Sequence, residues 1–338
     1  MLVGVRTRAI VALLGALLTV ATGSAATASR PPSLILFNKP PEVATGFGVI
    51  RPDGKGRRML SDDYFAKQWS PNGRQILAYG GPTGLAILND DGDLVRALPM
   101  GSDFLSEGTW SPDGRWIAGM TSRCQPPSDF CADLRLLRTD GSEDRVLVSA
   151  GLLALGAGVL YDWAPGGRAL AYSGSPTSVL EGGSRYVGIV IVSLTGKKVT
   201  REAFRGGGEP SWAPSGRRLA FSRQGRIYFA GRDGRGLKRV SRGAGALQPS
   251  WSPDGRRIAY LQTTRGGFAV RVLDLRRGRT IRIATVSAKV ELVWSPDGAR
   301  LTWSDFDAYY GTQHIFVARV DGRGKPHQIT EGWAPDWR

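Results

Sequence analysis

The residues of this sequence that could perform acid–base or metal chemistry are few and widely separated. The chain of 338 residues contains two histidines, His314 and His327. Neither has the H-x-x-H or H-E-x-x-H spacing of a metal-binding helix, and the sequence has no G-x-S-x-G nucleophile elbow. We therefore expect both histidines to pack against neighbours or to face solvent, and we predict no metal and no other cofactor.

Three carboxylates keep an enzymatic alternative open. Asp162, Glu209 and Glu331 each lie within a few residues of a tryptophan that recurs along the chain, a position from which they could line the central channel of a repeating fold. Paired carboxylates can cleave glycosidic bonds, one acting as acid and the other as base or nucleophile. The alternative function is therefore a hydrolase or lyase acting on cell-wall sugars or peptides, whereas the favoured prediction is a protein without enzymatic activity.

A short acidic run has some features of a calcium loop. The sequence "NDDGD" extends from Asn89 to Asp93, but it lacks the glutamate that closes an EF-hand. It also lies where a hairpin between two strands is expected. We predict an acidic turn at this position and no metal site.

The N-terminus and the cysteines both indicate export. Residues 1–28 combine two arginines, the apolar run Ala9–Ala21 and an A-x-A pattern ending at Ala28, which is typical of a cleaved signal peptide. A membrane anchor is the alternative, but a span needs about 20 apolar residues. No later stretch is long enough to cross a membrane. Cys124 and Cys131 are the only cysteines, and an oxidising compartment favours a local disulfide between them.

One decapeptide pattern dominates the rest of the chain. Copies of W-[SA]-P-x-G, followed by a short apolar segment, occur 39 to 53 residues apart. They begin at Trp69, Trp110, Trp163, Trp212, Trp251 and Trp294, and a truncated copy, "WAPDW", begins at Trp333. The acid of the turn is replaced by Asn72, Gly166 or Ser215 in three copies. A catalytic acid would not vary in this way, so the pattern indicates a repeating architecture.

Each repeat reads as a four-stranded meander. A strand ends on tryptophan, a Pro-Asp-Gly turn reverses the chain, and further strands follow, often joined by Asp-Gly hairpins. About 44 residues of this kind are typical of a propeller blade. We predict an all-β propeller of seven blades in which the C-terminal strand completes the N-terminal blade, with six blades as the alternative. The domain comprises residues 29–338 and is expected to be a monomer.

These motifs resemble the repeats of the TolB-like β-propeller family. The resemblance covers residues 33–338 and rests on the W-[SA]-P-x-G turns, the [IL]-A-[YF] strands and the Asp-Gly hairpins. It implies a propeller that binds partners in the cell envelope, in the periplasm or outside the cell. The additional α/β domain of the family's namesake and the catalytic domain of related peptidases have no counterpart among these residues.

The repeat assigns each connection to one of two faces. The face with the W-[SA]-P-x-G turns and the Asp-Gly hairpins, called the turn face below, is rich in basic residues: Arg51, Lys55, Arg57, Arg217, Arg218, Arg232, Arg235, Lys238, Arg239, Arg256, Arg257, Arg276, Arg277, Arg279 and Arg323. The opposite face, called the loop face, carries the longer loops with acids and aromatics. Its candidate binding residues are Tyr64, Phe65, Phe104, Asp305, Phe306, Asp307, Tyr309 and Tyr310.

The predicted function follows from these two faces. The favoured interpretation is an exported interaction module whose partner, an envelope protein or peptide, binds the aromatic and acidic residues of the loop face. The formal net charge of +16 adds a second interpretation, in which the turn face binds an anionic envelope polymer. Export argues against nucleic acid as the physiological partner.

Overall fold

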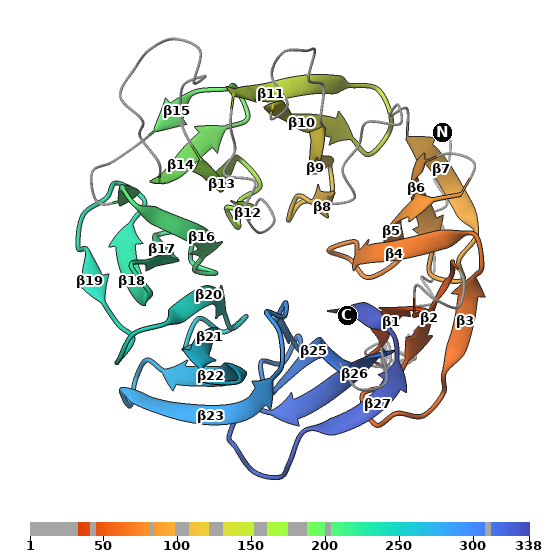
Figure 1. Cartoon of the computed structure of the whole chain (residues 1–338). Coiled ribbons are helices and arrows are strands. Elements are labelled where there is room, and N and C mark those ends of the chain that lie inside the picture. The colour runs from red at the N-terminus through yellow and green to blue at the C-terminus, as the bar shows by residue number, and fades with distance from the viewer. Residues whose placement is uncertain are drawn as a thin grey trace, which may run out of the picture. The chain divides into compact units, whose positions relative to one another are not determined.

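The structure is a ring of seven four-stranded antiparallel sheets (Figure 1). This computed structural model describes residues 33–40, 45–81, 84–98, 108–121, 131–151, 161–174, 188–199, 204–307 and 312–338. Residues 33–338 form one compact unit. The predicted seven-bladed propeller is therefore confirmed, and the predicted signal peptide lies outside the described residues.

The first blade closes the ring. Blade 1 consists, from the axis outward, of β28 (Trp333–Trp337), β1 (Ile35–Asn38), β2 (Phe47–Ile50) and β3 (Arg58–Ser61). The innermost strand thus comes from the C-terminal end of the sequence, as predicted. Strands β28 and β1 pair in antiparallel register from Trp337 opposite Ile35 to Trp333 opposite Asn38.

The other six blades each use four consecutive strands. Blade 2 contains β4 (Tyr64–Trp69), β5 (Gln75–Gly80), β6 (Gly84–Asn89) and β7 (Leu94–Leu98), and blade 3 contains β8 (Thr109–Trp110), β9 (Trp116–Thr121), β10 (Cys131–Arg138) and β11 (Asp144–Gly151). Blade 4 contains β12 (Tyr161–Trp163), β13 (Ala169–Gly174), β14 (Gly188–Ser193) and β15 (Lys198–Val199). Blade 5 contains β16 (Gly207–Trp212), β17 (Arg218–Arg223), β18 (Arg226–Gly231) and β19 (Lys238–Arg239). Blade 6 contains β20 (Ala246–Trp251), β21 (Arg257–Thr264), β22 (Gly267–Asp274) and β23 (Arg279–Val286), and blade 7 contains β24 (Val293–Trp294), β25 (Arg300–Asp307), β26 (Thr312–Arg319) and β27 (His327–Glu331).

The repeated turns are held by their own side chains. In blade 7 the Ser295 hydroxyl donates to Asp297, and the Ser295 oxygen accepts from the Arg300 amide at 2.9 Å. The hydrogen bond from Ser295 holds the pKa of Asp297 below its usual value. Gly298 has a φ of 66°, which a residue with a side chain adopts at a cost. These local bonds explain why Ser, Asp and Gly recur at this spacing.

The hydrophobic core lies between blades rather than within them. Each cluster of buried residues in the described chain joins the side chains of two adjacent blades, and the repeated tryptophan of one blade packs against the preceding blade. The indole Nε1 of Trp163 donates to the Thr109 carbonyl, and that of Trp294 donates to the Ser250 carbonyl. The tryptophan is thus the residue through which each blade is fixed to its neighbour.

The seventh repeated tryptophan is Trp337, and the prediction of Trp333 was wrong. Trp337 pairs with Ile35 in the register in which Trp251 pairs with Ile258, and it is 7% exposed. Trp333 begins the strand and donates its indole Nε1 to the Lys39 carbonyl. The motif predicts that the repeated tryptophan is the first one in "WAPDW". The strand in fact ends on the second, and this side chain reaches the core.

A backbone feature supports the same alignment. Glu209, Gln248 and Ala334 have φ values of 55°, 49° and 47°, and each precedes a proline and stands three residues before a tryptophan. A non-glycine residue in this conformation is uncommon. The pairing of the innermost strand shifts at this point in blades 5, 6 and 1. The three strands therefore share one bulge, with Trp337 at the position of Trp212 and Trp251.

Neighbouring blades are also tied by hydrogen bonds around the axis. In four blades, the side chain before the repeated tryptophan accepts a bond from the tryptophan amide of the next blade: Gln68 from Trp110, Asp162 from Trp212, Ser211 from Trp251 and Asp336 from Trp69. The last of these bonds links the C-terminal strand to blade 2. None of the described residues belongs to a helix with the length and hydropathy that a bilayer-spanning helix needs.

Candidate functional site

The loop face presents fewer exposed aromatic residues than expected. Tyr64 is 7% exposed, and Phe65 packs against Tyr79 and Trp333 with ring centroids 5.4 and 5.8 Å apart. Tyr64 belongs to the core of the junction between blades 1 and 2, so its prediction as an exposed anchor was wrong, whereas Phe65 is partly covered by these contacts. Their alternation along β4 puts the tyrosine in the core of the junction and leaves the phenylalanine half-buried.

Phe306 is the exposed aromatic of this face within the described chain. It is 40% exposed at the end of β25. The neighbouring Asp305 carboxylate accepts hydrogen bonds from the amide and the hydroxyl of Ser287, at 3.2 and 2.8 Å. Asp305 therefore holds the loop that follows β23. The other predicted residues, Phe104, Tyr309, Tyr310 and the side chain of Asp307, lie outside what the structure describes.

Two of the three acids of the enzymatic alternative have structural partners, and the third is exposed at the outer edge of its blade. Asp162 accepts from the Trp212 amide at 2.6 Å, and burial raises the pKa of this carboxyl group to about 7. Glu331 is exposed at the end of β27, the outermost strand of blade 7. The prediction of Glu331 near the channel depends on Trp333 being the repeated tryptophan, and Trp333 does not hold that position. In the ring, Glu331 lies at the outer edge of blade 7, on the side of the blade away from the axis.

Glu209 is the centre of a network between three blades. Its Oε2 accepts from the Ser222 hydroxyl and the Gln248 amide, and its Oε1 forms a 2.7 Å ion pair with Lys289. The side chain of Glu209 is 17% exposed. These bonds use both carboxylate oxygens to join blades 5 and 6 to the connection before blade 7. This arrangement positions strands and leaves the carboxylate neutralised by a lysine.

The remaining candidates for chemistry also serve local contacts. His314 bonds to Thr312 and Gln328, each at 2.9 Å, and His327 lies 3.1 Å from the Pro52 carbonyl. The residues that the structure describes contain no group of three or more His, Cys, Asp or Glu that could hold a metal ion. The side chains of Cys124 and Cys131 are outside those residues, so the disulfide stays a prediction.

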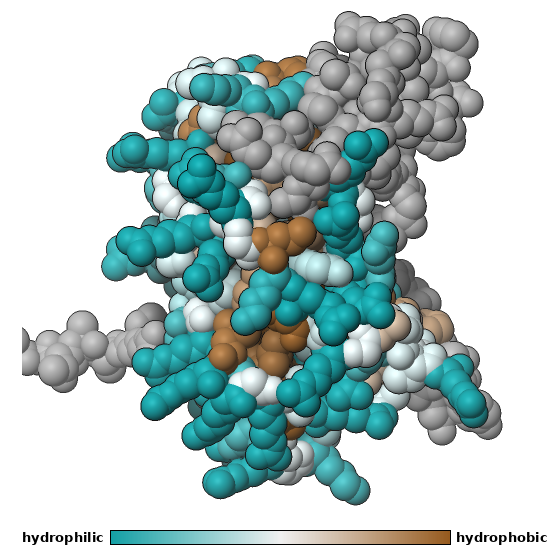
Figure 2. Space-filling view, turned by 90° about the vertical axis from the view of Figure 1, so that its left-hand side faces the viewer, coloured by the Kyte–Doolittle hydropathy of each residue, from teal (hydrophilic) through white to brown (hydrophobic). Residues whose placement is uncertain are grey.

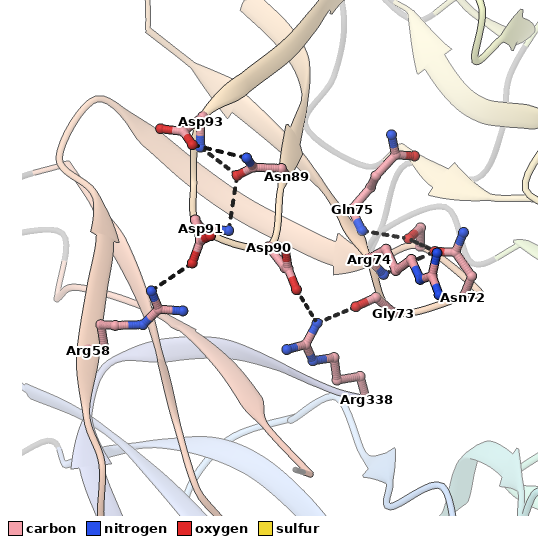
Figure 3. Close-up of polar contacts among 11 residues, drawn as sticks. Arg58, Asn72, Gly73, Arg74, Gln75, Asn89, Asp90, Asp91, Asp93 and Arg338 are labelled. Carbon is pink, nitrogen blue, oxygen red and sulfur yellow. Dashed lines mark hydrogen bonds and ion pairs between the residues drawn. The ribbon is translucent and has the colours of Figure 1, made fainter. Parts of the chain in front are cut away.

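The acidic hairpin of blade 2 is neutralised by arginines from blade 1 (Figure 3). Asp91 forms a 2.8 Å ion pair with Arg58, and Asp90 lies 3.4 Å from the Arg338 guanidinium. Asn89 organises the turn by accepting from the amides of Asp91 and Asp93. Segment 89–93 is thus a hairpin whose acids bind arginines across a junction between blades, as its interpretation as an acidic turn requires.

On the turn face, blades 5 to 7 carry an excess of exposed basic residues, in contrast to the acidic hairpin of blade 2. All the basic residues predicted for this face lie within the described chain, and most of those in blades 5 to 7 are exposed. The hairpins of blade 5 present Arg217, Arg218, Arg232, Arg235, Lys238 and Arg239 around one acid, Asp233. Arg235 and Asp233 form a long pair at 3.9 Å with the arginine 91% exposed. Figure 2 shows the side of the ring that carries β15, β18 and β19, where hydrophilic side chains dominate.

A groove of about 490 Å³ lies on this face between blades 6 and 7. Four of the predicted basic residues line it, namely Arg257, Arg277, Arg279 and Arg323. Val272, Ile281 and Val320 form its apolar part, and Asp274 and Asp321 are its acids. The volume is in the range of small-ligand pockets. The repeat predicts that these arginines lie on the turn face, but it does not predict that they line the same groove.

The arginines of the groove differ in how they are held. The half-buried Arg257 donates from Nη1 to the Gly298 carbonyl at 2.9 Å, which fixes its guanidinium at the junction. Arg277 is 3.8 Å from Asp274 and is 79% exposed. Within the described chain, the guanidinium groups of Arg279 and Arg323 form no hydrogen bond and no ion pair. The groove therefore holds cations that its own acids leave without a direct partner.

Comparison with known proteins identifies the fold and no closer relationship. No family model and no curated protein matches the sequence. Solved structures do match: TolB from Acinetobacter baumannii has a TM-score of 0.56 at 14% identity over 90% of this chain and 66% of its own. The chain has a TolB-like β-propeller fold. It thus spans just under two thirds of that TolB.

Other solved structures with this fold are enzymes. An oligogalacturonate lyase in complex with manganese matches with a TM-score of 0.60 at 16% identity, over 88% of this chain and 83% of the lyase. A puromycin-hydrolyzing peptidase of Mycobacterium tuberculosis matches with a TM-score of 0.63 at 14% identity, over 90% of this chain and 53% of the peptidase. Such identities show the fold alone, and this fold supports both binding and catalysis.

Proposed function

We propose that this protein is an exported, non-enzymatic propeller that acts as an interaction module in the cell envelope and binds an anionic polymer on its turn face. The observation that carries the proposal is the unbalanced charge of blades 5 to 7, where exposed arginines and lysines surround few acids. A surface of one sign attracts oppositely charged chains and releases their counterions.

Support for the non-enzymatic part comes from the acids near the axis. Asp162 and Asp336 bind backbone amides of the next blade, and Glu209 binds Lys289. Each of these carboxylates therefore has a structural task, which supports the proposal over the hydrolase or lyase alternative. Support for export comes from residues 1–28, whose composition is that of a signal peptide.

The proposal is tested by titrating residues 29–338 with polyphosphate at several salt concentrations. We expect the logarithm of the binding constant to fall steeply with the logarithm of the salt concentration. The variant Arg232→Gln/Arg239→Gln, on the turn face of blade 5, should bind several-fold more weakly. Its matched control is Arg242→Gln/Arg265→Gln, which removes the same charge from exposed positions in loop-face connections. Equal losses in the two variants, or binding that ignores salt, would contradict the proposal.

A second candidate function is supported by Phe306. An exposed aromatic side chain beside a fixed carboxylate is a common anchor for a protein or peptide partner. If the loop face binds such a partner, Phe306→Ala should abolish capture from envelope extract while the melting temperature stays unchanged, and a high-salt wash should not release the partner. Loss of the partner in high salt with no effect of Phe306→Ala would instead favour the turn face.

A further inference from the structure

We infer that the groove between blades 6 and 7 is a binding site for a phosphate group, held by Arg257, Arg279 and Arg323. The inference rests on the proposed function, since the groove is part of the same turn face, and it names the chemical group that this face recognises.

Arg279 and Arg323 come from different blades and line the same groove. Arg279 begins β23 in blade 6, and Arg323 follows the Asp-Gly turn of blade 7. In the hairpin of blade 5, the arginine that follows the Asp-Gly turn, Arg235, pairs with the acid of its own turn, Asp233, at 3.9 Å. Like charges that share a groove repel each other unless an anion lies between them.

The acids of the groove supply only part of that negative charge. Asp321 is engaged by Arg319, with 2.7 Å between Nη2 and Oδ2, and this hydrogen bond lowers the pKa of Asp321 to about 2. Asp274 accepts hydrogen bonds from the backbone amides of Arg276 and Arg277. Both carboxylates are therefore committed to their own hairpins. The positive charges of Arg257, Arg279 and Arg323 remain in excess.

The number of arginines and the elements that carry them favour phosphate over carboxylate. Arg257 is fixed by the Gly298 carbonyl, while Arg279 and Arg323 enter from the hairpins of two blades. A carboxylate has one charge and two oxygens in a plane, which suits one or two guanidinium groups. A phosphate monoester carries a charge of about −1.5 to −2 and three acceptor oxygens, which can bind guanidinium groups from several sides.

The apolar wall of the groove has a separate role. Val272, Ile281 and Val320 line it, and two of them are buried. Apolar side chains around a charged group reduce the local dielectric constant and so strengthen its attraction to the arginines. The same wall could contact the carbon skeleton that bears the phosphate. A repeating polymer with phosphate groups would place one of them here while its remaining charges follow blades 5 and 6.

The test uses pyrophosphate as the probe and calorimetry on residues 29–338. We expect one pyrophosphate per protein, and at least tenfold weaker binding by Arg279→Gln/Arg323→Gln. The matched control, Arg232→Gln/Arg239→Gln, removes the same charge from blade 5 and should change the affinity by less than about threefold. Citrate, a polycarboxylate, should bind at least tenfold more weakly than pyrophosphate. Melting temperatures of both variants that are no lower than that of the natural protein would show that they fold.

The outcomes separate this inference from the proposed function. Equal losses in the two double variants would overturn the groove as a site, and equal affinity for citrate would overturn the assignment to phosphate. If polyphosphate binds but pyrophosphate does not, the groove is not a site although the turn face still binds a polymer. If neither binds, both proposals fail. If pyrophosphate binds in the groove and polyphosphate does not bind, the groove is a site and the polymer proposal fails.

Discussion

Two junctions on the same face of the ring differ in how their charged side chains are paired. Between blades 1 and 2, Arg58 and Arg338 meet Asp91 and Asp90 across the seam, the junction next to the C-terminal strand that completes blade 1 (Figure 3). Between blades 6 and 7, Arg279 and Arg323 line a groove without forming an ion pair. Both junctions use Asp-Gly hairpins. The two junctions therefore differ in their ion pairs between blades and not in the type of their turns.

The seam needs these bonds because one of its strands is not continuous with the rest of its blade. Strand β28 has no turn connecting it to β1, and Arg338 lies where the other blades have their W-[SA]-P-x-G turn. Its guanidinium lies over the Trp69 ring at 4.0 Å and donates to the Gly73 carbonyl of the blade 2 turn. The arginine therefore replaces a covalent turn by contacts with the neighbouring blade.

The largest predicted effect is that of Trp337→Ala on the seam. Removing this side chain, which is 7% exposed, should lower the free energy of unfolding by about 3–5 kcal/mol. Trp333→Ala should cost only about 1 kcal/mol, since Trp333 is half-buried at the start of the strand. Denaturant unfolding of both variants measures the difference. Equal effects would show that Trp337 does not hold the position of the repeated tryptophan.

The next effect is a pH dependence that belongs to the seam. Burial raises the pKa of Asp336 from 3.8 to about 7, so folding favours the protonated carboxyl group. This contribution is fully present below pH 4 and is lost as the pH rises through 7. The loss builds up between pH 4 and 7, and above pH 7 it amounts to roughly 4 kcal/mol, since each pKa unit corresponds to about 1.4 kcal/mol.

Asp336→Asn tests this pH dependence because asparagine keeps an oxygen for the Trp69 amide and cannot ionise. We expect the stability of the variant relative to the natural protein to be greater at pH 8.5 than at pH 5 by roughly 3 kcal/mol, as measured by urea unfolding at both values. The comparison variant is Asp162→Asn, whose carboxyl group has the same kind of bond and a pKa also raised to about 7. A difference that does not change with pH would rule out ionisation of Asp336 as the cause.

A smaller effect is expected for Arg338→Ala. The side chain is 14% exposed and combines a contact with the Trp69 ring and a hydrogen bond to Gly73, so its loss should cost about 1–2 kcal/mol. Arg338→Lys should recover part of this loss, because a lysine keeps the charge over the ring but not the planar fork. If lysine and alanine variants unfold at the same denaturant concentration, the cation over the ring contributes nothing.

The smallest effects should have opposite signs at the two junctions. Arg58→Gln removes an exposed ion pair and should destabilise the protein by up to about 0.5 kcal/mol at low salt. Arg279→Gln/Arg323→Gln removes repulsion and should stabilise it by a similar amount. We expect both effects to become smaller in 0.5 M salt, which is on the order of the concentration that screens surface charges. Melting temperatures measured with and without this salt check the expectation. Destabilisation by the groove variant would mean that its arginines have partners in solution.

The sequence predicted the parts of this protein that depend on neighbours along the chain. The turns could be read because Ser295, Asp297 and Arg300 interact within five residues of one another. The hairpin at Asn89–Asp93 was predicted for the same reason. The position of Trp337 was missed although a signal was present: "PSW" precedes the turns of blades 5 and 6, and "PDW" ends the sequence. Alignment on that tripeptide would have identified the correct tryptophan.

The candidate site was predicted only in part. The four groove arginines were assigned to the turn face from the repeat, whereas the burial of Tyr64 and the contacts of Phe65 were not foreseen. Exposure at a strand end depends on which blade packs over it, and the sequence of one strand does not contain that information. The prediction of Glu331 near the channel failed for a different reason, since it inherited the error in the register of the last strand.

The sequence by itself determined the repeat, the turns, the seven blades and the closure of the first blade by the last strand, because short-range hydrogen bonds and alternating hydrophobicity specify each unit. Only the tertiary structure decided which charges meet between blades. Arg257 and Arg323 lie far apart in sequence and share one groove, and Arg58 meets Asp91 across the seam. Radial stacking creates these contacts between side chains that no local rule connects, so the difference between the two junctions is a property of the ring.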